Sequence, residues 1–265
     1  MTQSGITPFH SEAGRAMRKL YEQGQLSGWH GFIGSSVSRW LRPADLREFQ
    51  SCLDWSQPYR PIDAGCYPRL ARECFLFSQQ EGTNYGEDDN PFPFNFQVIQ
   101  VSGDGASYRI LWEKTLRHHP PMELSIHLTV HSVRSNGPGG VVYHCQPINT
   151  IALAALNREW GRDLVEELSH GFANVRNVVP DGIDVVPWGM TGSIQLGATM
   201  SPEMLVELTD FLKEIGEHTK NHQAVMLDGE GIICSSCSEY AVFGLINTVE
   251  HAAEIRLKML AAGGK

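Results

Sequence analysis

The chain has 265 residues, a formal net charge of −9 at pH 7, 42% hydrophobic residues and 19% charged residues. Its length favours a single domain over residues 1–265 with a substantial core, and its composition is that of a soluble globular protein. The acidic balance excludes a nucleic-acid partner, because phosphate binding requires basic patches. No apolar run is long enough to span a membrane, so no membrane partner is expected.

The N-terminal residues and the cysteine content indicate a cytoplasmic protein. Residues 1–7 are polar and lack the basic and apolar regions of a signal peptide. Six cysteines in a chain of this length do not make a disulfide scaffold, and they suit a reducing compartment.

The first third of the chain predicts two helices and a strand. Residues 9–26 place apolar side chains at helical spacing and predict an amphipathic helix. Pro43 stands at the first turn of a short helix that reaches Phe49. Residues 75–77 are apolar and predict a strand.

A hairpin and a helix are predicted next. Residues 95–102 alternate apolar and polar side chains, and Asp104-Gly105 forms a turn into a second strand. In the following helix Glu123, His127 and His131 share one face, since they recur every four residues. Histidines inside an apolar helix are more often hydrogen-bonded core groups than ligands, so we expect this of His127 and His131.

The stretch after Gly140 predicts a buried strand that arrives at a site. Three apolar residues, 141–143, lead into His144 and Gln146, which point to the same side because residues two apart on a strand share a face. A helix is expected from Ile148. Open α/β sheets build ligand sites at strand ends that turn into helices in this way.

The last third completes the predicted architecture. The expected elements are a strand at 183–188, a helix at 202–216 capped by Ser201, a strand at 224–227, a turn at 228–231 and a final helix at 240–260. Strands in the middle of the chain, with helices before, between and after them, predict a layered α/β protein.

Four segments resemble the class II aldolase and adducin family. They are His144-Cys145-Gln146-Pro147-Ile148-Asn149-Thr150-Ile151-Ala152-Leu153, together with residues 104–112, 180–188 and 243–248. The resemblance covers most of the chain in order. It implies a three-layer α/β/α sandwich with a central mixed or antiparallel sheet, and a homotetramer with sites at subunit boundaries.

The resemblance also implies the site residues. In the family three histidines hold zinc and a glutamate moves a proton; here His144, Gln146 and Glu230 occupy the three metal positions, and Glu123 occupies that of the catalytic glutamate. Zinc prefers imidazole and thiolate, whereas one imidazole with carboxylates suits Mn²⁺, Fe²⁺ or Mg²⁺. A bound divalent metal ion (Zn, Mn, Fe or Mg) is one interpretation. Loss of the metal, with His144 hydrogen-bonded to Glu230 or Glu123, is the other.

The family's phosphate-binding positions differ in this chain. Ile33-Gly34-Ser35-Ser36 replaces an Asn-Gly-Gly-Asn turn, and Pro121-Met122 replaces hydroxyls. Gln79-Gln80-Glu81-Gly82 replaces a Gly-Ser-Gly turn, and its carboxylate would repel a phosphate. We therefore expect a substrate that is not phosphorylated.

The substrate-binding candidates are two hydroxyl groups, a glycine and an amide: Gly34, Ser35, Ser36 and Asn174. Asn174 stands where relatives place an acidic residue that reaches a neighbouring subunit. The two serines are also ordinary turn residues, and we favour that interpretation for them.

Three weaker candidates have a structural alternative. Cys234-Ser235-Ser236-Cys237 has metal or redox spacing, but a lone pair of cysteines is more often two small core residues. His170 and Asp228 are possible substitute ligands.

Two functions follow from these observations. The first is an aldehyde-lyase that makes or breaks a C–C bond next to a carbonyl of a small carbonyl or polyol substrate, through a metal-stabilised enediolate; an isomerase or epimerase shares this chemistry. The second is a catalytically inactive aldolase-fold binding or assembly module, as in the adducin head domain. Retention of Glu123 and His144 favours the enzyme, and the changes at Gln146, Glu230 and Asn174 favour the module.

Overall fold

The computed structural model describes residues 6–30, 35–80, 94–114, 123–134, 136–187 and 201–264. The strands of these parts are β1 (Ser36–Trp40), β2 (Arg60–Pro61), β3 (Cys74–Gln80), β4 (Phe94–Val101), β5 (Ser107–Glu113), β6 (Val141–Cys145), β7 (Ile183–Val186), β8 (Ala224–Leu227) and β9 (Gly231–Ser236). The α-helices are α1 (Glu12–Leu26), α2 (Pro43–Phe49), α3 (Leu124–Val133), α4 (Ile148–Trp160), α5 (Leu164–Gly171), α6 (Val175–Val178), α7 (Pro202–Asn221) and α8 (Glu239–Ala261). Short 3-10 helices lie at Pro8–His10, Gln50–Cys52 and Pro68–Leu70.

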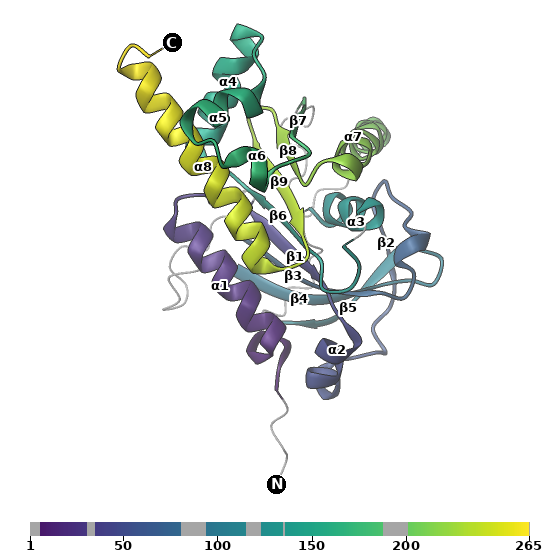
Figure 1. Ribbon diagram of the computed structural model, residues 1–265. Coiled ribbons are helices and arrows are strands. Elements are labelled where there is room, and N and C mark those ends of the chain that lie inside the picture. The colour runs from purple at the N-terminus through teal and green to yellow at the C-terminus, as the bar shows by residue number, and fades with distance from the viewer. Residues whose placement is uncertain are drawn as a thin grey trace.

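The strands form one sheet between two layers of helices (Figure 1). Their order is β2-β5-β4-β3-β1-β6-β9-β8-β7, and of the neighbouring pairs only β7 and β8 are parallel in the described chain. Helices α1 and α8 cover one face, with α4 and α5 packed on α8, while α3 and α7 pack together on the other face. The predicted three-layer α/β/α sandwich with a mixed sheet is confirmed.

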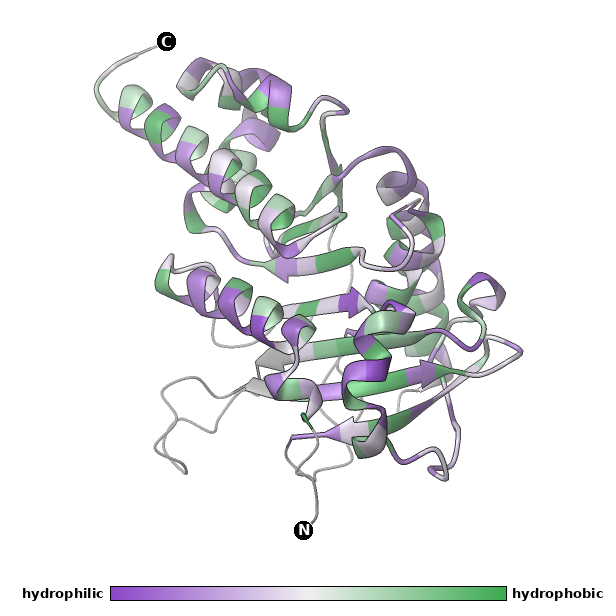
Figure 2. Ribbon diagram, turned by 60° about the horizontal axis from the view of Figure 1, so that its bottom comes forward, coloured by the Kyte–Doolittle hydropathy of each residue, from purple (hydrophilic) through white to green (hydrophobic). Residues whose placement is uncertain are grey.

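The two faces of the central strands bury different side chains. Val37 of β1 and Tyr143 of β6 belong to the core under α1 and α8. The alternate residues of the same strands, such as Val142, face α3 and α7. Figure 2 shows hydrophobic segments along the central strands, and helices around them that carry both hydrophobic and hydrophilic residues. Both faces of β1 are buried, so polar groups on it must find partners inside the protein.

The predicted helices differ from the observed ones at their ends. Helix α1 begins later than predicted, because the Ser11 hydroxyl caps it by accepting a hydrogen bond from the Gly14 amide at 3.0 Å. Helix α7 continues to Asn221 rather than ending at Gly216. A Cβ on Gly216 would lie 3.3 Å from the Thr129 side chain, so this glycine permits close packing of α7 on α3 instead of ending the helix.

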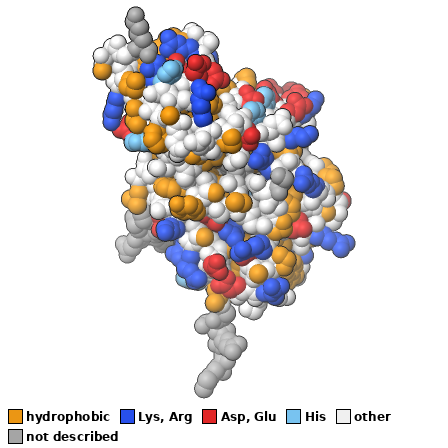
Figure 3. Space-filling view, viewed as in Figure 1, with side chains coloured by type: hydrophobic (Ala, Val, Ile, Leu, Met, Phe, Trp, Pro, Cys, Tyr) orange, Lys and Arg blue, Asp and Glu red, His pale blue; other side chains and the backbone are white. Residues whose placement is uncertain are grey.

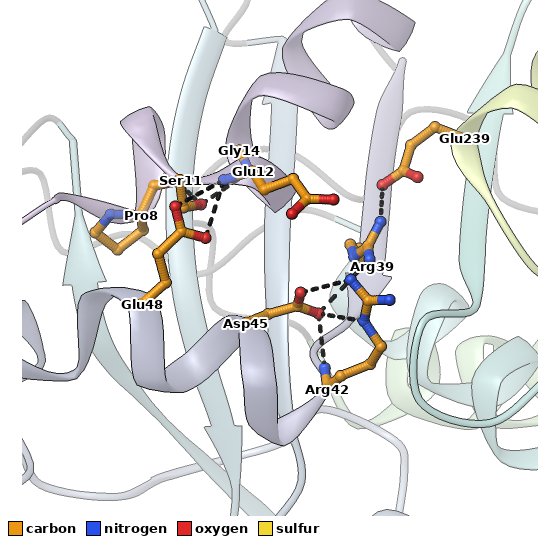
Figure 4. A network of polar contacts seen from close by, with 9 residues as sticks. All are labelled: Pro8, Ser11, Glu12, Gly14, Arg39, Arg42, Asp45, Glu48 and Glu239. Atoms are coloured by element: carbon orange, nitrogen blue, oxygen red, sulfur yellow. Dashed lines mark hydrogen bonds and ion pairs between the residues drawn. The ribbon is translucent and has the colours of Figure 1, made fainter.

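A buried ion-pair network joins β1 to helices on both sides of it (Figure 4). Arg39 contacts Glu239, at the start of α8, at 2.5 Å and Asp45 of α2 at 3.6 Å. Asp45 also receives hydrogen bonds from Arg42, which is far more exposed than Arg39. The network fixes α2 and the first turn of α8 relative to β1.

The surface carries charges of both signs. On the face that α1 and α8 form, Figure 3 shows basic, acidic and hydrophobic side chains mixed together rather than one basic patch. Among the described residues, no helix has the length and apolar character needed to cross a membrane.

Candidate functional site

Glu123 lies at the N-cap position of α3, directly over β1 and β6, and is 6% exposed. Helix α3 is held there from both sides: Leu124 and Leu128 pack into one hydrophobic cluster, and Ile126 and Val130 into another. The polar face between these two apolar stripes therefore points at the sheet. The i, i+4, i+8 pattern in the sequence describes this face correctly.

Each oxygen of the Glu123 carboxylate has a donor from a different strand. The His144 Nδ1 lies 2.7 Å from Oε1, and the Ser36 hydroxyl donates to Oε2. Ser36 and His144 are direct cross-strand partners in the antiparallel pair of β1 and β6. Side chains opposite one another on one face lie about 5 Å apart, which is the spacing that lets one carboxylate reach both.

Further polar groups continue from Ser36 into the interior. The Ser36 hydroxyl lies 2.8 Å from the His127 Nε2. The Ser38 hydroxyl lies 2.7 Å from the His127 Nδ1 and 2.9 Å from the His131 Nε2. His127 and His131 are thus hydrogen-bonded core groups, as predicted.

Burial sets the protonation states in this cluster. The Phe77 ring lies beside His127 at 4.7 Å between ring centroids, and the Phe75 ring lies beside His131 at 5.0 Å. Burial lowers the pKa of His131 to about 3 and also lowers the pKa of His127. Burial alone would raise the pKa of Glu123, but the charge and hydrogen bond of His144, with a contribution from His127, outweigh it and hold this pKa well below its usual range. Glu123 is therefore a carboxylate, and both α3 histidines are neutral imidazoles near neutral pH.

The other two predicted metal positions lie beside each other at the end of the sheet. The Gln146 amide donates to Glu230 Oε1 at 3.0 Å, and both side chains are half-buried. Glu230 follows β8 in the turn that leads to Gly231. A Cβ on Gly231 would lie 3.0 Å from the His144 Nε2, so this turn approaches the imidazole closely.

In the described residues, no three His, Cys, Asp or Glu side chains are arranged to hold a metal ion. His144, Gln146 and Glu230 are one imidazole, one amide and one carboxylate, and only two of the three belong to these types. Because oxygen ligands predominate, their chemistry fits a hard divalent ion better than zinc. The ligand assignment stays a prediction.

The substrate-binding candidates fall in three different environments. Gly34 lies outside the described residues, as do Pro121-Met122 and Glu81. Ser36 is wrongly predicted as a turn residue: it begins β1, a strand buried between β3 and β6. Ser35 is buried just before it, with its hydroxyl 3.5 Å from the Trp29 carbonyl oxygen.

Asn174 and the weaker candidates lie apart from this cluster. Asn174 is exposed at the start of α6, where its side chain accepts a hydrogen bond from Asn177. His170 is exposed on α5. Asp228 forms an ion pair with Arg158.

The two cysteines with metal or redox spacing lie in unlike surroundings. Cys234 is buried in β9, whereas Cys237 is exposed beyond the strand. The interpretation as small core residues is therefore correct for Cys234 and wrong for Cys237.

One polar residue of the cluster has no motif in the sequence. The Ser38 hydroxyl contacts both α3 histidines. A single serine in a short strand of mixed apolar and polar residues carries no functional signal of its own. The combination of two serines two residues apart and two histidines four residues apart was the available signal, and it has meaning only once β1 and α3 are known to pack together.

Comparison with known proteins gives one consistent result. The model of the class II aldolase and adducin N-terminal domain matches residues 94–257. A rhamnulose-1-phosphate aldolase of Pectobacterium atrosepticum is 30% identical over 244 residues, which are 91% of this chain and 82% of that protein.

Solved structures agree on the fold. A sugar-phosphate aldolase from Thermotoga maritima superposes with a TM-score of 0.70 at 19% identity, covering 95% of this chain and 96% of that one. An l-fuculose-1-phosphate aldolase from Thermus thermophilus superposes with a TM-score of 0.50 at 15% identity, covering 95% and 97% of the two chains.

Proposed function

This chain belongs to the class II aldolase and adducin family, and from that premise we propose that it is an aldehyde-lyase that makes or breaks a carbon–carbon bond next to a carbonyl group. The observation that carries the proposal is the placement of Glu123, an ionised carboxylate fixed against His144. An isomerase or epimerase reaction needs the same proton transfer next to a carbonyl and belongs to the same proposal.

In this proposal Glu123 is the group that moves the proton. A carboxylate is ready to accept a proton from carbon or from a hydroxyl, and positioned bases of this kind contribute typically about 10²- to 10⁴-fold to a rate. His144 donates to one carboxylate oxygen through Nδ1 and thereby orients it. Because Nδ1 faces Glu123, the His144 Nε2 points away from it.

His144, Gln146 and Glu230 are the residues that would hold a divalent cation, such as Mn²⁺, Fe²⁺ or Mg²⁺. A cation bound there supplies a Lewis acid for a carbonyl or hydroxyl oxygen of the substrate. Two observations support the fit. The Glu123 carboxylate orients the His144 ring through Nδ1, as a carboxylate usually does for metal-binding histidines. On the other side of the ring, residue 231 is a glycine, so no Cβ occupies the space 3.0 Å from Nε2.

We propose that the substrate is a small carbonyl or polyol compound without a phosphate group. The hydroxyl of Ser36, which stands at a phosphate-binding position of the family, is directed at Glu123 instead. The adjacent Ser35 is 1% exposed. Neither serine is therefore available to an anion in this arrangement.

We also propose the homotetramer that the family resemblance implies. A residue that reaches a neighbouring subunit must lie on the surface, and Asn174 does so. A cytoplasmic location agrees with free cysteines throughout the described chain.

A second candidate is the inactive binding or assembly module of the same fold. It is favoured by the lack of a metal-binding group of three His, Cys, Asp or Glu side chains among the described residues, and by the Gln146 amide, which is hydrogen-bonded to Glu230.

Elemental analysis and an aldehyde-release screen separate these possibilities. The purified chain is expected to carry about one divalent ion per subunit and to release aldehyde from a non-phosphorylated ketose. Glu123→Gln is expected to lower this rate at least about a hundredfold. Glu113→Gln, which changes another buried carboxylate, on β5, is the matched control. Turnover of rhamnulose 1-phosphate would contradict the proposed substrate class, and absence of both metal and turnover would favour the module.

A further inference from the structure

The polar residues under α3 are spaced to interleave. Two residues along a strand advance about 6.7 Å, and four residues along a helix advance about 6 Å. Ser36 and Ser38 therefore match His127 and His131, and their contacts alternate between strand and helix at 2.7 to 2.9 Å. The result is a continuous hydrogen-bonded row that ends on the carboxylate of Glu123.

The row can have only one direction. The Ser36 hydroxyl donates its single proton to Glu123 Oε2. The Ser36 oxygen must then accept from His127, which places the proton of His127 on Nε2.

The same reasoning continues along the row. With its proton on Nε2, a neutral His127 has a lone pair on Nδ1, so Ser38 donates to it. Ser38 in turn accepts from His131, which therefore carries its proton on Nε2. Every donor of the row therefore points towards Glu123.

We infer that Ser36, His127, Ser38 and His131 are positioning residues for Glu123. Together they fix the plane of its carboxylate, so that Oε1 stays on His144 while Oε2 stays on Ser36. The inference rests on the proposed function only in that Glu123 is the proton-moving group. It assigns a role to four residues that stand outside the expected metal positions.

Histidine tautomers test the direction of the row without any substrate. In the full chain labelled with ¹⁵N-histidine, two-bond ¹H–¹⁵N correlation spectra are expected to show His127 and His131 with the proton on Nε2, and His144 with Nδ1 protonated. A His127 protonated on Nδ1, or a mixture of its tautomers, would overturn the inference whatever the activity of the protein.

Removing one hydroxyl at a time tests the positioning itself. Ser36→Ala is expected to shift the His144 Nδ1–H resonance, because both side chains bind the Glu123 carboxylate. Ser38→Ala leaves Glu123 untouched and is expected to convert His127 to a mixture of tautomers, so it serves if Ser36→Ala does not fold. Ser78→Ala removes a buried hydroxyl that has no hydrogen-bond partner among the described residues and is the matched control.

With an active substrate in hand, Ser36→Ala is expected to lower kcat about tenfold and to change KM less than twofold, because one hydrogen bond to a charged group is lost. Ser36→Thr keeps the hydroxyl and is expected to restore most of kcat. If the wild-type protein shows no turnover but has the expected tautomers, the proposed function is refuted while the direction of the hydrogen-bonded row is confirmed. An unchanged His144 resonance in Ser36→Ala would refute the positioning role.

Discussion

Ser36 and His144 lie directly opposite one another on β1 and β6, and each binds one oxygen of the Glu123 carboxylate. The register of the two strands is therefore part of the site. A shift of one residue would turn one of these side chains to the opposite face of the sheet, where α1 and α8 pack.

The ionised state of Glu123 makes stability depend on pH in a specific direction. Because its folded-state pKa is held below the usual carboxyl value, its contribution is fully present above the unfolded-state pKa of about 4.3 and is lost as pH falls below that value. Urea unfolding at pH 7, 5 and 3.5 is expected to show wild type losing part of its stability advantage over Glu123→Gln between pH 5 and 3.5. A difference that stays constant over this range would contradict the assignment.

Two desolvated histidines predict a second pH dependence at higher pH. Burial lowers the pKa values of His30 and His131 to about 3. Between pH 6.5 and 3 these two histidines are therefore protonated in the unfolded chain but not in the folded protein, and the free energy of unfolding decreases as the pH is lowered. From pH 6.5 to pH 5 each contributes a loss of about 2 kcal/mol in the free energy of unfolding.

Denaturant titration of His131→Gln, compared with wild type, measures this slope. The variant is expected to lose less stability than wild type on acidification over the same interval. His170→Gln changes an exposed histidine of α5 and should follow the wild-type profile. Parallel curves for wild type and His131→Gln would refute the prediction.

Gly231 is expected to tolerate no side chain. A Cβ there would lie 2.4 Å from the Cys145 carbonyl oxygen and 3.0 Å from the His144 Nε2. Gly231→Ala should cost about 1–3 kcal/mol of unfolding free energy, because the strand and the imidazole must shift. Gly244→Ala, in α8 with nothing within 4 Å of the new Cβ, is expected to be neutral or stabilising. Equal effects of the two substitutions in urea unfolding would show that the turn is looser than described.

The buried ion pairs of Arg39 predict an asymmetry between two neighbouring arginines. Arg39→Ala leaves Glu239 buried without its closest cation and should destabilise the protein by about 3–5 kcal/mol. Arg42→Ala removes a cation whose side chain is 45% exposed and should cost about 1 kcal/mol or less. Thermal and urea unfolding of both variants measure the difference, and similar costs would contradict the structural ranking.

The sequence allowed the layered architecture and most elements to be predicted, because these are encoded locally. The period of α3, the alternation in β4 and the Ser201 cap of α7 each lie within a few residues. The stop predicted at Gly216 was wrong because a glycine needed for packing looks the same in sequence as one that ends a helix.

The site was harder to predict than the fold. The pair of Glu123 and His144 came from the family resemblance, and the structure brings these two side chains together. Ser36 was wrongly given a turn conformation, since its strand is defined by β3 and β6, which follow much later in the chain. Ser38 could not be singled out, because its partners are supplied by the packing of a helix more than eighty residues away.

The position of β1 in the sheet has a consequence for biosynthesis. It pairs on one side with β3 and on the other with β6, which is translated roughly a hundred residues after it. At about 5–20 residues per second, the nascent polypeptide exposes that unpaired edge for about 5–20 s. Until β6 is available, the backbone N–H and C=O groups of β1 on that side form an open template on which another chain could pair.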